Sequence, residues 1–326
     1  MGNQVGIDIG PVYIRIAVLI QEECNNSLSS FYLQTHFGVI YYFKLLKEEY
    51  RSFESFPIYE KIIKHKNIPI TITGMRFDGM HQTISDYYDF TYNSVVTSQC
   101  ISKALDTLNT LSLNSFFYYG GSCTRINVIH RGQPENTTKI PISSSIYPCL
   151  IVNVREGLSI YKFSSPDSCE KVSGTSIGSS TFWGLIKLCT NYKTPEEAIE
   201  EAALGDNGQA DLTVGDIYGG DYSNIGLGAD IIASSCAKLT TKIANQRDLA
   251  RSLLVMFAYN LTLIAYMVSK VEMIENIVVI GNAVSPPLFM HKAQESVNFW
   301  SRGSGKLIFS EYGAYMGALG ALLQNN

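Results

Sequence analysis

The stretch that decides the fold reads PCLIVNVREGLS over residues 148–159 and continues, after a polar connection, as KVSGTSIGSSTFW over residues 171–183. The first segment is apolar and β-branched, which is typical of a buried strand. The second places two glycines, six hydroxyl side chains and one lysine at the start of an expected helix. Free backbone N–H groups and the positive helix end would hold an anion there. An ordinary tight turn with hydroxyl caps would carry the same residues, so this segment alone leaves both interpretations open.

The N-terminus carries a second apolar pair of strands with one acid near the tip. Residues 5–10 read VGIDIG and residues 14–20 read IRIAVLI, which predicts a β-hairpin over residues 5–20. Asp8 lies between Ile7 and Ile9, where burial of a carboxylate is costly unless it faces a wet or metal-bearing cleft. A turn-capping aspartate is the alternative interpretation.

Together the two segments resemble the actin-like ATPase superfamily, in which an early Asp-x-Gly-Gly hairpin and a later glycine and hydroxyl loop close around nucleotide phosphates. The resemblance narrows to the eukaryotic-type (type II) pantothenate kinases, which transfer the γ-phosphate of ATP to pantothenate, the first step toward coenzyme A. Each matching motif is weak alone, and their common order along most of the chain carries the resemblance. The matching stretches are residues 6–10, 152–159, 174–178, 215–222, 248–251, 299–303 and 313–320.

The resemblance implies an α/β fold with two actin-like (ribonuclease H-like) lobes and the nucleotide in the cleft between them. The similar hairpins at residues 6–20 and 152–163 fit this plan. We predict an N-terminal lobe over residues 1–93 and a C-terminal lobe over residues 94–326 that carries the dimerisation helix.

Hydrophobic patterns place the other elements. Residues 252–268 are mainly apolar, yet they are slightly short for a bilayer and contain an asparagine and two tyrosines, so we predict a core or interface helix and no membrane span. Strands are expected at residues 30–43, 68–74, 116–119, 126–130 and 277–282, and helices within 44–66, 94–113, 182–188, 194–204, 248–270, 289–300 and 312–324. Residues 131–145, with two prolines and several hydroxyl residues, are expected to form an irregular connection.

Composition excludes several classes of protein. A chain of 326 residues with 46% hydrophobic and 17% charged residues can bury one large or two medium cores. The net charge of −4 argues against non-specific binding to nucleic acid or to a membrane surface. Seven scattered cysteines without a Cys-x-x-Cys pair are typical of reduced thiols in an intracellular protein. No basic-then-apolar leader follows Met1, and we predict a cytoplasmic protein.

The resemblance assigns the nucleotide side of the site. It implies ATP and Mg²⁺ as cofactors, with Asp8 as a catalytic residue on the metal side. The phosphate loops would consist of Gly10, Gly174, Thr175, Ser176, Gly178, Ser179 and Ser180. The chain departs from the family here: serines replace two of three glycines after residue 177, and Pro11 and Val12 replace Gly-Thr. Proline removes one N–H donor from the first phosphate hairpin.

The resemblance also assigns the acceptor side. Asp78 stands where the family has a glutamate as general base; it is one methylene shorter, and capping of the turn before Gly79 is the alternative. The substrate residues would be Ser159, Lys171, Tyr222 and Trp300. The family supplies the tryptophan across its dimer interface. Lys171 replaces an arginine, which keeps the charge and loses the bidentate fork that suits a carboxylate.

The largest departure is the pair Arg155 and Glu156, which replaces Gly-Ser at a strand tip. Two long charged side chains at that tip would crowd the nucleotide or the acceptor. Because the departures gather in the site while the scaffold motifs remain, the sequence indicates a retained fold with a relaxed site.

Two functions follow from the resemblance. The first is an active pantothenate kinase that forms 4'-phosphopantothenate, as a homodimer, with coenzyme A or acyl-coenzyme A as candidate effectors. The second is a weakly active or inactive kinase-like subunit that pairs with a paralogous kinase chain. Other actin-like ATPases, such as a sugar or acetate kinase, remain as a third class.

Overall fold

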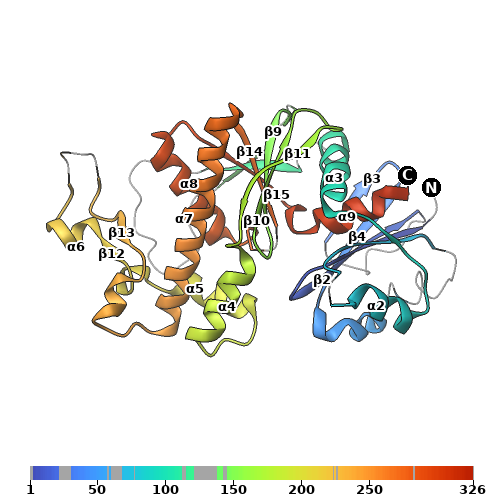
Figure 1. Ribbon diagram of the computed structural model, residues 1–326, viewed down its shortest axis with the longest axis horizontal. Coiled ribbons are helices and arrows are strands. Elements are labelled where there is room, and N and C mark those ends of the chain that lie inside the picture. The colour runs from blue at the N-terminus through green and yellow to red at the C-terminus, as the bar shows by residue number, and fades with distance from the viewer. Residues whose placement is uncertain are drawn as a thin grey trace.

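The computed structural model describes residues 3–21, 31–56, 59, 68–76, 78–111, 115–120, 138–141, 145–222, 224, 227–281 and 283–325. Two mixed sheets lie in neighbouring lobes, and helices α3 and α9 lie between them (Figure 1). The described residues therefore show the predicted α/β, two-lobed architecture.

The first sheet has six strands in the order β3-β4-β2-β1-β5-β6. Its strands are β1 (Gln4–Ile9), β2 (Tyr13–Ile20), β3 (Tyr32–Thr35), β4 (Gly38–Leu46), β5 (Ile70–Gly74) and β6 (Asn93–Ser94). Strands β1 and β2 pair antiparallel, which confirms the predicted hairpin. Ile7 and Ile9 join a core with α2 (Met80–Tyr88). Since side chains alternate between the faces of a strand, Asp8 lies on the opposite face, toward the second lobe.

The second sheet has seven strands in the order β11-β10-β9-β14-β15-β7-β8. These are β7 (Phe116–Gly120), β8 (Thr138–Pro141), β9 (Cys149–Val154), β10 (Leu158–Phe163), β11 (Cys169–Thr175), β14 (Asn276–Gly281) and β15 (Leu307–Ser310). Strand β9 is buried on both faces: Val152 packs in one core, and Ile151 packs in another. This two-sided burial explains the continuous apolar run in the sequence.

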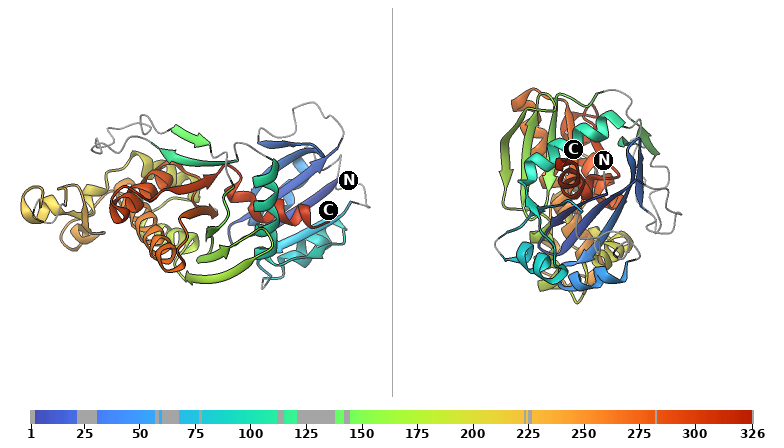
Figure 2. Two further views of the ribbon diagram at one scale, coloured as in Figure 1. Left: turned by 90° about the horizontal axis from the view of Figure 1, so that it is seen from above. Right: turned by 90° about the vertical axis from the view of Figure 1, so that its right-hand side faces the viewer.

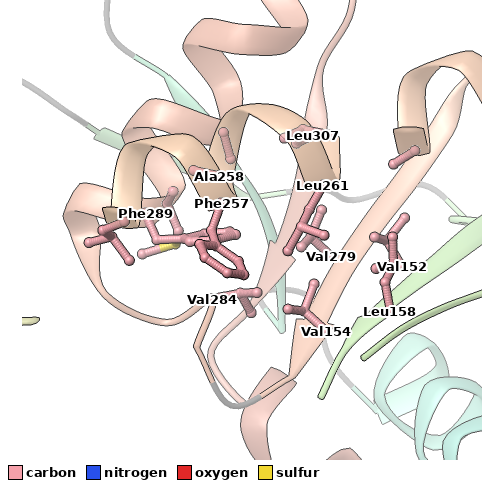
Figure 3. Packing of buried hydrophobic residues seen from close by; sticks show 14 of the residues in the cluster. Val152, Val154, Leu158, Phe257, Ala258, Leu261, Val279, Val284, Phe289 and Leu307 are labelled. Atoms are coloured by element: carbon pink, nitrogen blue, oxygen red, sulfur yellow. The ribbon is translucent and has the colours of Figure 1, made fainter. Parts of the chain in front are cut away.

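Four helices cover the outer face of the second sheet: α4 (Ser179–Cys189), α5 (Pro195–Leu204), α7 (Gln246–Glu272) and α8 (Pro287–Ser301). Figure 3 shows Phe257 and Leu261 of α7 against Val279 of the sheet. By length and composition α7 is apolar enough to cross a membrane, but 61% of its most apolar window is buried inside the protein. That burial fits the predicted core helix. A small outlying unit contains β12 (Leu212–Thr213), α6 (Val214–Tyr218) and β13 (Ile232–Ser234).

The structure corrects one local prediction. Residues 138–141 form β8 within the stretch expected to be irregular, and β8 is an edge strand, the position in a sheet where a proline such as Pro141 is tolerated. Lys47–Ser55 forms a 3₁₀ helix within residues 44–66, which confirms a helix there. The strand predicted at residues 126–130 lies outside the described residues, as does most of the segment from 57 to 67.

Helices α3 (Thr97–Leu111) and α9 (Met316–Leu322) connect the two lobes. Helix α9 packs on β1 and on α3, as Figure 2 also shows, although it follows the second sheet in sequence. The approach is close: a β-carbon at Gly6 would lie 2.1 Å from the carbonyl oxygen of Ala318. The division at residues 93/94 stays a prediction, and the first sheet shares its inner core with a segment near the C-terminus.

A glycine-to-alanine pair tests this packing. A β-carbon at Gly320 would lie 1.8 Å from the backbone oxygen of Cys100, so Gly320→Ala must push α9 away from α3. We expect the free energy of unfolding, measured in urea, to fall by about 1–3 kcal/mol or more. Gly184→Ala is the matched control, since an added β-carbon there meets no atom within 4 Å. In the control, higher helix propensity should raise stability by up to about 1 kcal/mol, and equal losses in both variants would contradict the packing argument.

Candidate active site

A cavity of about 640 Å³ lies between the lobes, with walls from both sheets. The first lobe contributes the end of β5, helix α3 between the lobes contributes its first residue, and the second lobe contributes the β9–β10 turn with β10 and β11. Its lining residues are Gly74, Met75, Thr97, Asn153, Arg155, Glu156, Gly157, Leu158, Ser159, Tyr161, Lys171, Gly174, Thr175 and Ser176. The predicted acceptor residues Ser159 and Lys171 thus share one wall with part of the predicted phosphate loop.

Asp8 forms an ion pair across the cleft. Arg155 Nη1 donates to Asp8 Oδ2 at 2.6 Å, and the two side chains are only 11% and 1% exposed. Asp8 belongs to β1 of the first sheet, whereas Arg155 begins the β9–β10 turn of the second. The residue that departs most from the family pattern is therefore bound to the predicted metal ligand.

A second guanidinium lies beside the same carboxylate. Arg15 faces Asp8 in the β1–β2 register and is 2% exposed. Burial lowers the pKa of Arg15 to about 10, against the opposing effect of Asp8. Nε and Nη1 of Arg15, like Asp8 Oδ1, have no hydrogen-bond partner among the described residues. One carboxylate thus faces two buried cations.

Two glycines enclose Asp8. A β-carbon at Gly317 would lie 2.3 Å from Asp8 Oδ2, and one at Gly74 would lie 2.9 Å from Oδ1. Gly74 also has φ +99°, a conformation that other residues rarely adopt. The start of α9 and the end of β5 therefore fix the carboxylate position through backbone contact.

The phosphate loop is joined to the turn that carries Arg155. The backbone N–H and the hydroxyl of Ser179 both donate to the carbonyl oxygen of Arg155 at 2.6 Å. Gly178 allows this approach, since a β-carbon there would lie 2.5 Å from Gly157 Cα. The N–H of Gly10 donates to the carbonyl of Tyr13 at 2.9 Å. The N–H of Gly178 donates to Thr181 Oγ1 at 3.2 Å, so the backbone N–H groups of at least three predicted phosphate residues are already bonded within the protein. The Ser180 hydroxyl is buried without a partner among the described residues.

Asp78 is held outside the cavity wall. Lys47 Nζ donates to Asp78 Oδ2 at 2.7 Å, and the N–H of Met80 donates to Oδ1 at 3.2 Å. Burial acts to raise the pKa of the Asp78 carboxyl, but the bonds from Lys47 and Met80 leave it below the ordinary value. A carboxylate with a lowered pKa is a weak base. The contacts of Asp78 in this structure fit the alternative role named above, in which it caps the turn before Gly79.

A second ion pair also bridges the two lobes. Lys44 Nζ of β4 donates to Glu196 Oε1 of α5 at 2.6 Å, and the Tyr13 hydroxyl donates to Glu196 Oε2. Burial raises the pKa of Tyr13, and the bond to Glu196 raises it further. Burial also acts to raise the pKa of Glu196, but the bonds from Lys44 and Tyr13 lower it overall.

The remaining predicted substrate residues lie away from this cavity. Tyr222 stacks on Tyr218 with ring centroids 4.3 Å apart, beside the outlying helix α6 (Figure 1). Trp300, near the end of α8, is 46% exposed and meets Phe299 edge to face. Neither lines the cavity, so any contact of theirs with substrate at this cavity requires a second chain or a movement.

The described residues do not fit Mg²⁺ at Asp8. The described residues contain no group of three or more histidine, cysteine, aspartate or glutamate residues arranged to hold a metal ion, so Mg²⁺ here would depend on Asp8 and on substrate phosphates. Asp8 Oδ2 is taken by Arg155, and Arg15 adds a second positive charge. Mg²⁺ is normally bound by carboxylates together with substrate phosphates. Among the described residues, the carboxylate enclosed by Gly74 and Gly317 is that of Asp8, and Arg155 already neutralises its charge.

The sequence analysis does not identify several of these contacts. Arg15 lies within a strand predicted as apolar, and the hairpin register places it beside Asp8. The alternation of side chains along that strand is the sequence feature that indicates this position. The partners Lys44 and Glu196 are 152 residues apart, and no local pattern connects them.

The buried ion pair gives a stability prediction. Asp8→Asn leaves Arg155 and Arg15 facing a neutral amide, so unfolding free energy should fall by about 3–5 kcal/mol. Glu201→Gln, which breaks the exposed pair with Arg247, is the control and should cost under about 1 kcal/mol. Urea titrations followed by circular dichroism measure both, and a loss at Asp8 no larger than the control would refute a role for this pair in stability.

The Lys44–Glu196 pair gives a pH prediction. Because the folded pKa of Glu196 lies below its ordinary value of 4.5, its contribution is complete above that value and is lost as pH falls through the folded pKa. We expect the wild-type protein to be more stable than Glu196→Gln by up to about 1 kcal/mol at pH 7, and equally stable at a pH below the folded pKa of Glu196. Thermal unfolding measured at several pH values between these two conditions tests this. A stability difference that does not change with pH would rule out the ion pair as its source.

Comparison with solved structures supports the fold. Component A of (R)-2-hydroxyglutaryl-CoA dehydratase from Acidaminococcus fermentans superposes with a TM-score of 0.51 at 10% identity, covering 99% of this chain and 97% of that chain. At that identity the likeness shows the fold alone. Together with the two sheets and the helices between them, it confirms the predicted actin-like architecture.

Two curated relatives share about half of the chain. Pantothenate kinase 2 of Oryza sativa subsp. japonica is 38% identical over 187 residues, which is 55% of this chain and 21% of that protein. A 4'-phosphopantetheine phosphatase of Mus musculus is 35% identical over 183 residues, 55% of this chain and 22% of that protein. The chain spans about a fifth of the length of these relatives. Residues 5–324 match the family model described as Fumble, and the chain therefore belongs to the Fumble family, that of the type II pantothenate kinases.

Proposed function

We propose that this chain binds ATP and pantothenate in the interlobe cavity and phosphorylates pantothenate to 4'-phosphopantothenate. One observation carries the proposal: Ser159 and Lys171, from the acceptor side of the resemblance, line the same cavity as Gly174, Thr175 and Ser176 from the phosphate side. A phosphoryl group can pass between two substrates only when both reach one space.

The chemistry of the walls suits these ligands. Lys171 supplies a cation for the carboxylate of pantothenate, and the Ser159 hydroxyl supplies a hydrogen-bonding group beside it. The cavity volume of about 640 Å³ lies within the ordinary range for small-molecule sites.

Transfer of the phosphoryl group forms one bond to phosphorus and breaks another. The primary hydroxyl oxygen of pantothenate forms a bond to the γ-phosphorus as the bond from that phosphorus to the β–γ bridging oxygen breaks, and ADP leaves. The hydroxyl proton passes to a carboxylate, which the family resemblance assigns to Asp78. Since Asp78 is bonded to Lys47 and is absent from the described cavity wall, it must first leave Lys47, and we expect slow turnover by the chain alone.

Two contacts favour a second candidate function. The ion pairs Arg155–Asp8 and Lys47–Asp78 occupy both carboxylates that the family uses. A kinase-like subunit that pairs with a catalytic paralogue would tolerate both. Apolar side chains exposed along α7 and α8, including Val271, Phe299 and Trp300, provide surface for such a partner or for a second copy.

A binding experiment tests the proposal. Lys171→Met removes the cation assigned to the pantothenate carboxylate; a charged hydrogen bond contributes about 1.5–3 kcal/mol, so pantothenate affinity by calorimetry should fall about 10- to 150-fold. Lys187→Met is the matched control, because Lys187 lies on α4 near Trp183 and outside the described cavity wall, and its affinity should match wild type.

The outcomes separate the two candidates. Pantothenate binding with release of ADP supports the kinase. Pantothenate binding without product, even with ATP, supports the subunit. A chain that binds no pantothenate, or a Lys171→Met variant equal to wild type, overturns the assignment of this cavity.

A further inference from the structure

Arg155 occupies the place beside Asp8 that a divalent cation would need. Its Nη1 lies 2.6 Å from Asp8 Oδ2, and its Nε lies 3.8 Å from Glu156 Oε2. The side chain is only 11% exposed, yet it lines the cavity. The Arg155 guanidinium is thus held in place by the protein and is also accessible to a ligand in the cavity.

The backbone of Arg155 holds this side chain in position. Its carbonyl oxygen accepts the N–H and the hydroxyl of Ser179, and its N–H donates to the carbonyl of Gly157 at 2.9 Å. Ser179 is the first residue of α4. The guanidinium therefore belongs to the same rigid turn as the helix end that would receive phosphate.

The local charges favour an anion over a cation. Asp8 is paired with Arg155 and is also opposite Arg15 in the β1–β2 register, and both arginines are largely buried. Lys171 adds a further positive charge to the cavity wall, against the single carboxylate of Glu156. Among the described groups at this point of the cleft, positive charge exceeds negative, so an incoming metal ion would be repelled and a polyphosphate attracted.

Burial does not remove the charge from Arg155. Desolvation acts to lower its pKa, but the neighbouring carboxylates of Asp8 and Glu156 leave the pKa above the ordinary value. The side chain thus remains a guanidinium throughout the physiological range.

We propose that Arg155 is a built-in counter-ion that replaces the divalent cation at Asp8, so that this chain binds a nucleoside triphosphate as the free anion rather than as its magnesium complex. The inference rests on the proposed nucleotide site in this cavity. A metal ion carried in by the nucleotide would meet the Arg155 guanidinium and weaken binding.

Calorimetric titration of the full chain with the ATP analogue AMPPNP, in EDTA and again in excess Mg²⁺, tests this directly. Wild type should bind the analogue in EDTA at least as tightly as in Mg²⁺. Arg155→Gly exposes Asp8 and should reverse the order, with binding about tenfold tighter in Mg²⁺, a difference of about 1.4 kcal/mol. Arg155→Gln removes the charge with less loss of packing and keeps the test usable if the glycine variant does not fold.

A metal probe gives an independent readout. With Mn²⁺ and AMPPNP, electron paramagnetic resonance should show protein-bound Mn²⁺ in Arg155→Gly and none in wild type. Arg247→Met is the control for loss of a surface arginine, because Arg247 pairs with Glu201 and is largely exposed; it should keep the wild-type pattern.

The failures are distinguishable. Wild type that binds AMPPNP only with Mg²⁺, with bound Mn²⁺ in the spectrum, overturns the counter-ion role and leaves the kinase proposal standing. Wild type that binds the analogue in neither condition overturns the counter-ion role as well, and pantothenate titration then shows whether the acceptor cavity survives. An Arg155→Gly variant with unchanged metal preference also contradicts the inference.

Discussion

The contact between Asp8 and Arg155 links the two lobes across the cleft. A buried charge is tolerated only when another charge or several donors compensate it, and here each side chain compensates the other across the boundary between two sheets. The glycine cradle around Asp8 and the Ser179 bonds to the Arg155 backbone fix both partners. This pair therefore determines the charge beside Asp8, and it holds the lobes together alongside the Lys44–Glu196 pair and helices α3 and α9.

This arrangement explains how a retained fold accompanies an altered site. The apolar cores on both faces of β9 and the packing of α7 depend on residue periodicity, which substitutions at a strand tip do not disturb. An arginine in place of a small residue at such a tip therefore changes the contacts inside the cleft and leaves these cores unchanged. Family membership thus establishes the scaffold of this chain, whereas its activity depends on a few contacts in the cleft.

Local features of the sequence predicted most of the scaffold. Both hairpins, α5 with its threonine cap and α7 followed from patterns within a few residues, and the structure confirms them. The sequence does not predict which charged residues form ion pairs, because the partners are far apart in the chain. Arg155 and Asp8 are 147 residues apart, and Lys47 and Asp78 belong to different parts of the first lobe. From the sequence, Arg155 is a departure expected to crowd the nucleotide or the acceptor; only the fold shows that it binds the Asp8 carboxylate. The sequence does not indicate strand β8, because a proline favours a loop unless the edge position of the strand is known.

The packing of α9 on β1 has a consequence for the order in which the protein folds during synthesis. Domains generally fold as units, the N-terminal one first, while the rest of the chain is still being made. Here the face of β1 that packs on α9 can be covered only after residues 316–322 have been synthesised, and these residues leave the ribosome long after the strand itself. Until then Gly6 and the Asp8 carboxylate have no cover, so the nascent first lobe exposes its future cleft to solvent and to chaperones.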